Sequence, residues 1–233
     1  MSISPFPIIS SSIPAGDRDT SRPVMLIGFQ EQANLGLGYL ASVLREQGYR
    51  VEVFDFEADS QTLLQAALEL RPVLVGFSLI FQFYIDRFRS LMRLMRGGGV
   101  HCHFTMGGHF PSLSYEKTLE LIPELDSVVR FEGELTLLEL VDSLATGRDW
   151  RDLQGIAYVN GTEVIATPLR PLVDNLDRFP YPERTNKRKN TILGHTATSL
   201  IASRLSAVAK RRAREAIERF ERIPTGDALD KAG

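Results

Sequence analysis

The sequence predicts an α/β protein built on a five-stranded, parallel, doubly wound sheet. From Val24 onward, short runs of β-branched and apolar residues alternate with segments of helical pattern, which is typical of βαβ units. Five such units fit before the pattern changes. Right-handed crossovers between parallel strands place their helices on both faces of the sheet. Ligands of such sheets bind beyond the carboxyl ends of the strands.

Each predicted element has its own segment. The predicted strands are Val24–Phe29, Arg50–Asp55, Val73–Ser78, His101–Met106 and Ser127–Phe131. The predicted helices are Leu35–Gln47, Ser60–Leu70, Tyr84–Arg96, Ser114–Leu121 and Leu135–Ala145. Asn34 is the predicted N-cap of the first helix, because its short side chain can accept a hydrogen bond from a backbone amide of the first turn.

The chain changes character after the fifth helix. Gly155–Val159 and Thr162–Thr167 flank Asn160-Gly161, which favours a type I′ hairpin at the edge of the sheet. Four prolines in residues 168–182 favour an extended linker. Thr198–Arg204 is a predicted strand, and Leu205–Arg222, rich in Ala, Arg and Glu, a predicted helix. The expected fold is thus flavodoxin-like, or Rossmann-like, with an added β-hairpin and a C-terminal helical tail.

Composition limits the possible functions. With 233 residues, 43% of them hydrophobic and 24% charged, the chain is long enough to bury the core of one domain. Its single cysteine, Cys102, excludes an internal disulfide and any all-cysteine metal or iron–sulfur site made by this chain alone. The apolar start lacks basic residues before its hydrophobic ones and is broken by prolines. It predicts neither a signal peptide nor a spanning helix, and we expect a cytoplasmic protein.

Three short clusters lie at the ends of the first, third and fourth predicted strands. They are Glu31-Gln32-Ala33-Asn34-Leu35-Gly36, Ser78-Leu79-Ile80 and Gly107-Gly108, with 41 and 26 residues between them. Glycine permits close approach of a ligand to the backbone, and a serine hydroxyl can donate to a buried nitrogen. The glycine pair leaves room for a flat heterocycle. Each cluster alone is also explained by ordinary turn chemistry, but their order indicates a ligand site.

This ordered set resembles the cobalamin-binding domains, whose clusters follow the patterns Asp-x-His-x-x-Gly, Ser-x-Leu and Gly-Gly at similar spacing. Ala33 stands where the family has the histidine whose ring nitrogen coordinates cobalt, which a methyl group cannot do. The combination is similar to the cobalamin-binding N-terminal domain of cobalamin-dependent radical S-adenosylmethionine (SAM) proteins, which generally lack that histidine. The resemblance runs from about Val24 to Arg204.

The resemblance continues in Arg130-Phe131-Glu132-Gly133-Glu134, which is similar to the family's Arg-Gly-Glu-Gly-Glu. It implies that the two carboxylates face the rim of the ligand, although capping of the next helix is an alternative, favoured for Glu134. His109 would lie near the corrin ring or be a solvated loop histidine. The resulting cofactor-binding candidates are Glu31, Gln32, Ala33, Asn34, Leu35, Gly36, Ser78, Leu79, Ile80, Gly107, Gly108, His109, Glu132, Gly133 and Glu134.

Two further groups of side chains have simpler explanations. His101 and His103 flank Cys102 on the predicted fourth strand, with both imidazoles on one face and the thiol on the other. Two ligands without a third partner favour packing over a zinc site. An aromatic group around the serine cluster either walls the pocket or belongs to the core. Its members are Phe77, Phe81, Phe83 and Tyr84.

The catalytic half of the family is missing from this sequence. In the family, a strand similar to Ser199–Arg204 leads into a Cys-x-x-x-Cys-x-x-Cys loop that holds a [4Fe–4S] cluster and SAM, whereas Leu205 follows here. We therefore expect no radical SAM activity from this chain alone, but a fragment, frameshift product or split subunit. The resemblance implies a catalytic domain in trans and methylation of a small molecule or lipid.

The expected domain organisation follows from these boundaries. Residues 1–22 form a flexible N-terminal segment, 23–150 the cobalamin-binding domain, and 151–184 the hairpin and Pro-rich linker. Residues 185–233 form a basic tail, a vestige of the start of the radical SAM domain plus a helix. The tail holds 11 basic and 5 acidic residues, whereas residues 1–184 hold 16 and 24.

Other classes of protein fit parts of this sequence pattern. A flavodoxin-like regulatory or protein-interaction domain without corrinoid is the main alternative, with the charged tail as its contact surface. A receiver-like domain would need its aspartate after the third strand, where Ser78 stands. The basic runs of the tail alternate with glutamates, which indicates a solvated helix surface rather than a nucleic-acid partner.

Overall fold

A computed structural model describes the central part of the chain. The residues described are 19–30, 34–171, 173, 179–182, 190–192 and 195–197. Contacts divide the chain into two compact units, Met1–Ser199 and Leu200–Gly233. The second unit, with the predicted tail helix, and the strand predicted at Thr198–Arg204 lie outside the described residues.

The first unit contains a seven-stranded sheet of order β2-β1-β3-β4-β5-β6-β7. Strands β1 to β5 pair in parallel, and β6 and β7 continue the sheet in antiparallel pairing. The predicted parallel sheet and the predicted edge hairpin are therefore confirmed. The strands are β1 (Val24–Gly28), β2 (Val51–Asp55), β3 (Leu74–Ser78), β4 (His103–Gly107), β5 (Ser127–Val129), β6 (Ile156–Asn160) and β7 (Glu163–Ala166).

Six α-helices and one short 3-10 helix connect the described strands. As predicted, the Asn34 side chain caps the first helix: its Oδ1 accepts a hydrogen bond from the Leu37 amide at 3.1 Å. Asp59 caps the second in the same way, through the Thr62 amide at 3.0 Å. The sequence did not predict α4. The helices are α1 (Leu35–Glu46), α2 (Ser60–Leu70), η2 (Gln82–Tyr84), α3 (Ile85–Gly97), α4 (His109–Leu113), α5 (Tyr115–Leu121) and α6 (Gly133–Thr146).

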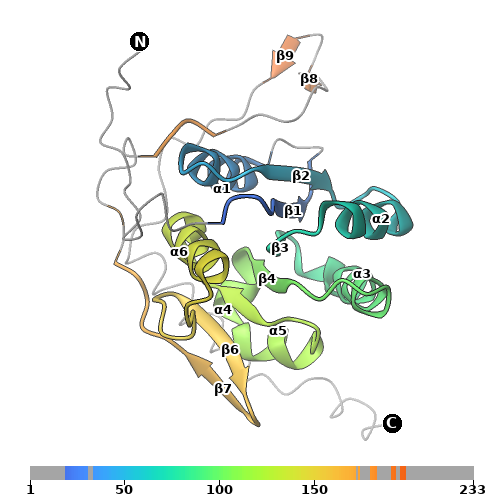
Figure 1. The fold of residues 1–233 in the computed structure, drawn as a ribbon. Coiled ribbons are helices and arrows are strands. Elements are labelled where there is room, and N and C mark those ends of the chain that lie inside the picture. The colour runs from blue at the N-terminus through green and yellow to red at the C-terminus, as the bar shows by residue number, and fades with distance from the viewer. Residues whose placement is uncertain are drawn as a thin grey trace, which may run out of the picture. The chain divides into compact units, whose positions relative to one another are not determined.

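Both faces of the sheet are buried, which explains why its strands are almost wholly apolar. Met25 and Ile27 face the core that α2 and α3 cover, whereas Val24 and Leu26 face the core under α1 and α6. Figure 1 shows these two helix pairs on opposite sides of the strands. The fold is thus doubly wound, as the sequence predicts. Within the described ranges, no helix is long and apolar enough to cross a membrane.

The fourth strand begins later than predicted. His101 and Cys102 precede β4, because the Arg96 guanidinium at the end of α3 donates to the carbonyls of Val100 and Cys102 at 3.2 and 2.8 Å. These carbonyls therefore bond to a side chain instead of a neighbouring strand. The prediction that both imidazoles share one face of a strand is wrong: His101 is exposed, whereas His103 is buried.

A short antiparallel hairpin follows the Pro-rich segment. Its strands are β8 (Asn190–Ile192) and β9 (His195–Ala197), and they form a separate two-stranded sheet. The sequence did not predict this hairpin.

Candidate functional site

The carboxyl ends of three neighbouring strands carry residues with little or no side chain. Gly28 ends β1, Ser78 ends β3 and Gly107 ends β4, and the three lie in one register across the sheet. β1 and β3 are the strands from which the chain leaves in opposite directions, so this edge is the topological switch point where open α/β sheets bind ligands. Sequence reasoning identified Ser78 and Gly107 but missed Gly28.

The turn after β4 requires a glycine at position 108. Gly108 has φ of +120°, and a Cβ there would lie 2.1 Å from the carbonyl oxygen of Leu79. The Leu79 amide in turn donates to the Gly107 carbonyl at 2.9 Å. The loop after β3 and the turn after β4 are therefore in direct backbone contact. The Leu79 side chain itself is fully buried in the core.

Gly107 has no such requirement. A Cβ at this position would come no closer than 3.4 Å to another atom, the Val129 carbonyl oxygen, and its φ is not positive. Neither packing nor backbone conformation therefore explains why position 107 is a glycine. The missing side chain leaves space at the carboxyl edge of the sheet.

The first turn of α1 packs against this edge at the end of β1. A Cβ on Gly28 would lie 2.7 Å from Leu37 Cδ1 and 3.0 Å from Ser78 Cβ, so α1 packs closely on the end of β1. The Asn34 Nδ2 atom is buried here and has no hydrogen-bond partner among the described residues. A buried amide donor without a partner is unfavourable unless a ligand or water accepts its hydrogen bond.

The loop after β5 also lies at this edge and is hydrogen-bonded through Ser112 to the turn at Gly107-Gly108. The Ser112 hydroxyl donates to the Gly108 carbonyl at 2.6 Å and accepts from the Phe131 amide at 2.8 Å. A single buried serine thus holds the two loops together. Sequence reasoning missed Ser112, because a serine in a short helix carries no signal of this role.

The candidate residues after β5 surround the start of α6. Glu132 precedes the helix, and its carboxylate accepts from the Val173 amide at 3.5 Å. Glu134 is buried in the first turn, where the positive end of the helix dipole favours a carboxylate. The structure therefore brings Asn34, Leu35 and Gly36 to the same edge of the sheet as the other candidates. Those others are Ser78, Leu79, Ile80, Gly107, Gly108, His109, Glu132, Gly133 and Glu134.

Two groups of the predicted site differ from the rest. His109 is exposed at the first position of α4, directly after the glycine pair. Glu31, Gln32 and Ala33 lie outside the described residues, so the structure says nothing of their placement.

The aromatic group near Ser78 divides between core and surface. Phe77 is buried, whereas Phe81 and Phe83 are 46% and 71% exposed. Phe29, at the end of β1, lies with its ring centroid 6.4 Å from that of Phe81 and 4.8 Å from that of Tyr84. This group therefore borders the carboxyl edge beside β1 and β3, and one member belongs to the core.

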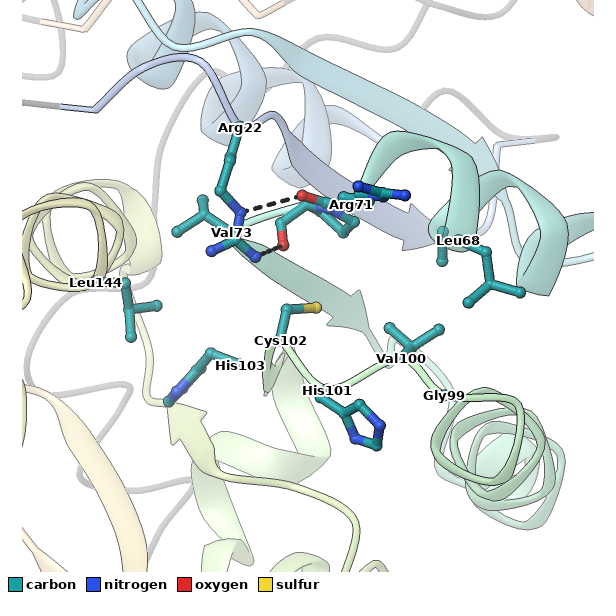
Figure 2. Close-up of a pocket in the computed structure, with 12 residues that line it drawn as sticks. Arg22, Leu68, Arg71, Val73, Gly99, Val100, His101, Cys102, His103 and Leu144 are labelled. Atoms are coloured by element: carbon teal, nitrogen blue, oxygen red, sulfur yellow. Dashed lines mark hydrogen bonds between the residues drawn. The ribbon is translucent and has the colours of Figure 1, made fainter.

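The opposite edge of the sheet holds a groove of about 710 Å³. Figure 2 shows it at the amino ends of β3 and β4, with Arg22 beside Cys102. The Arg22 guanidinium donates to the carbonyls of Arg71 and Pro72 at 3.2 and 2.6 Å, so its charge is already engaged. The groove is remote from the predicted site.

Two titratable groups of this groove, Cys102 and His103, are uncharged near neutral pH. Burial raises the pKa of the Cys102 thiol to about 11. Burial also lowers the pKa of His103 to about 4. The His103 Nε2 lies 2.8 Å from the Ser127 hydroxyl, and its ring packs edge-on against Trp150. The described residues contain no group of three or more His, Cys, Asp or Glu side chains that could hold a metal ion.

The fold and the residues at the carboxyl ends of β1, β3 and β4 are typical of α/β domains that bind a ligand at this edge. Residues 28–141 match the family model of the B12 binding domain. The match begins at Gly28 and ends within α6, so it includes the segments that follow β1, β3, β4 and β5 at the carboxyl edge of the sheet.

Proteins of similar sequence include methyltransferases. The chain is 34% identical over 151 residues to an uncharacterized methyltransferase of Pyrococcus horikoshii, covering 64% of this chain and 32% of that protein. It is 27% identical over 163 residues to the hopanoid C-3 methylase of Methylococcus capsulatus, covering 69% and 31%. The chain thus spans about a third of the length of these relatives.

Solved structures of cobalamin-dependent enzymes have the same fold. The radical SAM enzyme OxsB, with aqua-cobalamin bound, matches with a TM-score of 0.60 and 26% identity over 70% of this chain and 24% of that one. The radical SAM methyltransferase TsrM of Kitasatospora setae, with cobalamin and a [4Fe-4S] cluster bound, matches with a TM-score of 0.57 and 22% identity, over 70% and 31%. At that identity, the second likeness bears on the fold alone.

Proposed function

We propose that this protein binds cobalamin at the carboxyl edge of β1, β3 and β4, as the cofactor-carrying part of a cobalamin-dependent radical SAM methyltransferase. The observation that carries the proposal is the row of Gly28, Ser78 and Gly107 at the switch point of the region that matches the B12 binding domain. Side chains are absent or small where a large flat cofactor needs access to the backbone. The comparisons favour no alternative class.

The described residues fit this cofactor. The space at Gly107 accommodates a flat group, and the half-buried Ser78 hydroxyl is available to donate to a nitrogen of cobalamin's benzimidazole tail. The Asn34 Nδ2 supplies a buried donor that has no partner among the described residues. Glu132 and Glu134 lie at the start of α6 near the same edge, where a carboxylate can accept hydrogen bonds from corrin amides.

Position 33 bears on how cobalamin would be held. Ala33 has no atom that can coordinate a metal, so this residue would not be a cobalt ligand. When bound, cobalamin supplies a cobalt centre that can carry and release a methyl group. The chain's own residues contribute binding, orientation and exclusion of water.

The catalytic part of the reaction belongs to a partner in this proposal. The family's [4Fe–4S] cluster needs three cysteines, and this chain has one. A radical SAM domain acting in trans would supply the cluster and SAM, with a small molecule or lipid as the methyl acceptor. This assignment is supported by the methyltransferases to which the chain is similar. A cytoplasmic location remains our expectation.

The test is a titration of the purified protein with hydroxocobalamin, followed by desalting and an absorbance spectrum. We expect retained corrinoid with a base-off spectrum, and a changed spectrum in the Ala33→His variant, because an imidazole introduces a possible cobalt ligand. The matched control is His101→Ala, at the exposed opposite edge, which should bind as the parent does. Loss of all corrinoid on desalting would contradict the proposal and leave a flavodoxin-like interaction domain.

A further inference from the structure

Phe131 has a backbone conformation that is unusual for a residue with a bulky side chain. Among the described residues, only Arg71 and Phe131 combine a side chain with a positive φ, of +48° and +61°. Arg71 ends α2 as a left-handed C-cap, which is an ordinary place for that conformation. Phe131 ends no helix and lies between β5 and α6. For a bulky residue this conformation is strained, and glycine would relieve the strain.

The surrounding bonds hold Phe131 firmly in this conformation. Its amide donates to the Ser112 hydroxyl at 2.8 Å, and that hydroxyl donates to the Gly108 carbonyl at 2.6 Å. On its other side, the preceding Arg130 amide donates to the Gly155 carbonyl at 2.8 Å. The backbone of Phe131 is therefore fixed one hydroxyl group away from the turn at Gly107-Gly108. Strained residues that are held in this way cluster at ligand sites.

The ring of Phe131 remains partly accessible at this edge. Its side chain is half-buried, and the Arg130 guanidinium carbon lies 5.7 Å from its ring centroid and 4.3 Å from that of Tyr115. Close by, Gly107 leaves a space that neither packing nor φ demands. Gly107 and Phe131 thus belong to two turns of the same edge that Ser112 links through Gly108. The first leaves room, and the second keeps an aromatic ring on a strained backbone. A flat aromatic ligand group between them explains both.

We propose that Phe131 is a ligand-contact residue whose ring packs against the flat heteroaromatic tail of the bound cofactor, above the space left by Gly107. This inference rests on the proposed cobalamin function and adds a specificity residue to it. Aromatic rings attract one another through offset or edge-to-face packing, so the contact favours a cofactor that carries its benzimidazole tail. A corrinoid without the tail gains nothing from Phe131.

The experiment compares two probes, hydroxocobalamin and dicyanocobinamide, which lacks the nucleotide tail. Phe131→Asn keeps a residue that tolerates positive φ but removes the ring. We expect it to raise the Kd for hydroxocobalamin about tenfold and to change that for dicyanocobinamide less than about twofold. Phe131→Tyr should bind both as the parent does. The matched control, Arg71→Asn, relaxes the same kind of backbone strain at the opposite edge and should change neither Kd.

A second variant separates stacking from simple packing. Phe131→Leu keeps an apolar side chain in the same backbone, so a packing role predicts binding close to that of the parent, whereas stacking predicts a loss similar to that of Phe131→Asn. The ranking of the Kd values of Phe131→Tyr, Phe131→Leu and Phe131→Asn for hydroxocobalamin distinguishes the two roles, even if one variant folds poorly. The melting temperatures of the ligand-free variants show whether each is folded.

The two proposals fail in different ways. If the parent protein binds neither probe, the cobalamin function falls and this inference falls with it. If the parent binds hydroxocobalamin but Phe131→Asn binds it equally well, or weakens both probes equally, only the role of Phe131 is overturned.

Discussion

The two edges of the same sheet differ in how their polar groups are satisfied. At the amino edge, Arg96 binds the carbonyls of Val100, Cys102 and Glu124 and stacks on Phe104 at 3.7 Å. At the carboxyl edge, glycines replace side chains and Asn34 Nδ2 has no partner among the described residues. The amino edge also holds a groove and one buried atom, Glu124 Oε2, without a partner among the described residues. The carboxyl edge differs in that such an atom lies beside strand ends that lack side chains, which is what a ligand-binding surface requires.

Each edge has a glycine with positive φ, but only the one at the carboxyl edge lies against another part of the backbone. Replacing it gives the largest expected loss of stability. Gly108→Ala places a Cβ 2.1 Å from a backbone oxygen, so something must move, and we expect a loss of about 3 kcal/mol in the free energy of unfolding. Gly99→Ala, at the amino-edge groove, has φ of +97° but nothing within 4 Å, and should lose about 1 kcal/mol. Urea denaturation measures both, and equal losses would show that the Leu79 contact is not tight.

The amino edge has a pH dependence that arises from His103. Burial lowers the pKa of His103 to about 4 from 6.5, so between these values the unfolded chain binds a proton that the folded protein does not. Stability is therefore full above pH 6.5 and decreases as the pH falls towards 4, by up to about 3 kcal/mol.

The control for this pH dependence is His103→Gln, which keeps a polar partner for Ser127 but does not titrate. Unfolding measured between pH 4 and 7 should give a flatter slope for the variant. An unchanged slope would assign the pH dependence to other groups.

Removing the Ser112 hydroxyl tests the link between the two loops of the carboxyl edge. Ser112→Ala deletes the hydrogen bonds to Gly108 and Phe131, and we expect a loss of about 1–2 kcal/mol in stability. Cobalamin should also bind more weakly, because the loops lose their common anchor. Ser90→Ala, which removes an exposed bond within α3, should alter neither quantity. Calorimetry and the corrinoid titration provide the two readouts, and a variant that behaves like Ser90→Ala would contradict the anchoring role.

Much of the fold could be predicted because its signals are local. Every parallel strand was identified from its apolar run, since strands buried on both faces leave few alternatives. Asn34 as a cap and the hairpin at Asn160-Gly161 follow from side-chain and turn chemistry within a few residues. The glycine pair and the serine cluster were likewise visible as motifs within the range that matches the B12 binding domain, and their role as ligand contacts stays a prediction.

Other features depend on residues that are distant in sequence. The register that aligns Gly28 with Ser78 and Gly107, and the hydroxyl that joins Gly108 to Phe131, exist only after the strands pair. The late start of β4 has the same origin, because a side chain of α3 captures the carbonyl of Cys102. The sequence by itself thus determined the five parallel strands, most of the helices between them and the hairpin of β6 and β7, since propensity and periodicity act locally, but not α4 or the hairpin of β8 and β9. Only the tertiary structure decided which residues meet at each edge of the sheet, since hydrogen-bond partners and free space are set by long-range packing.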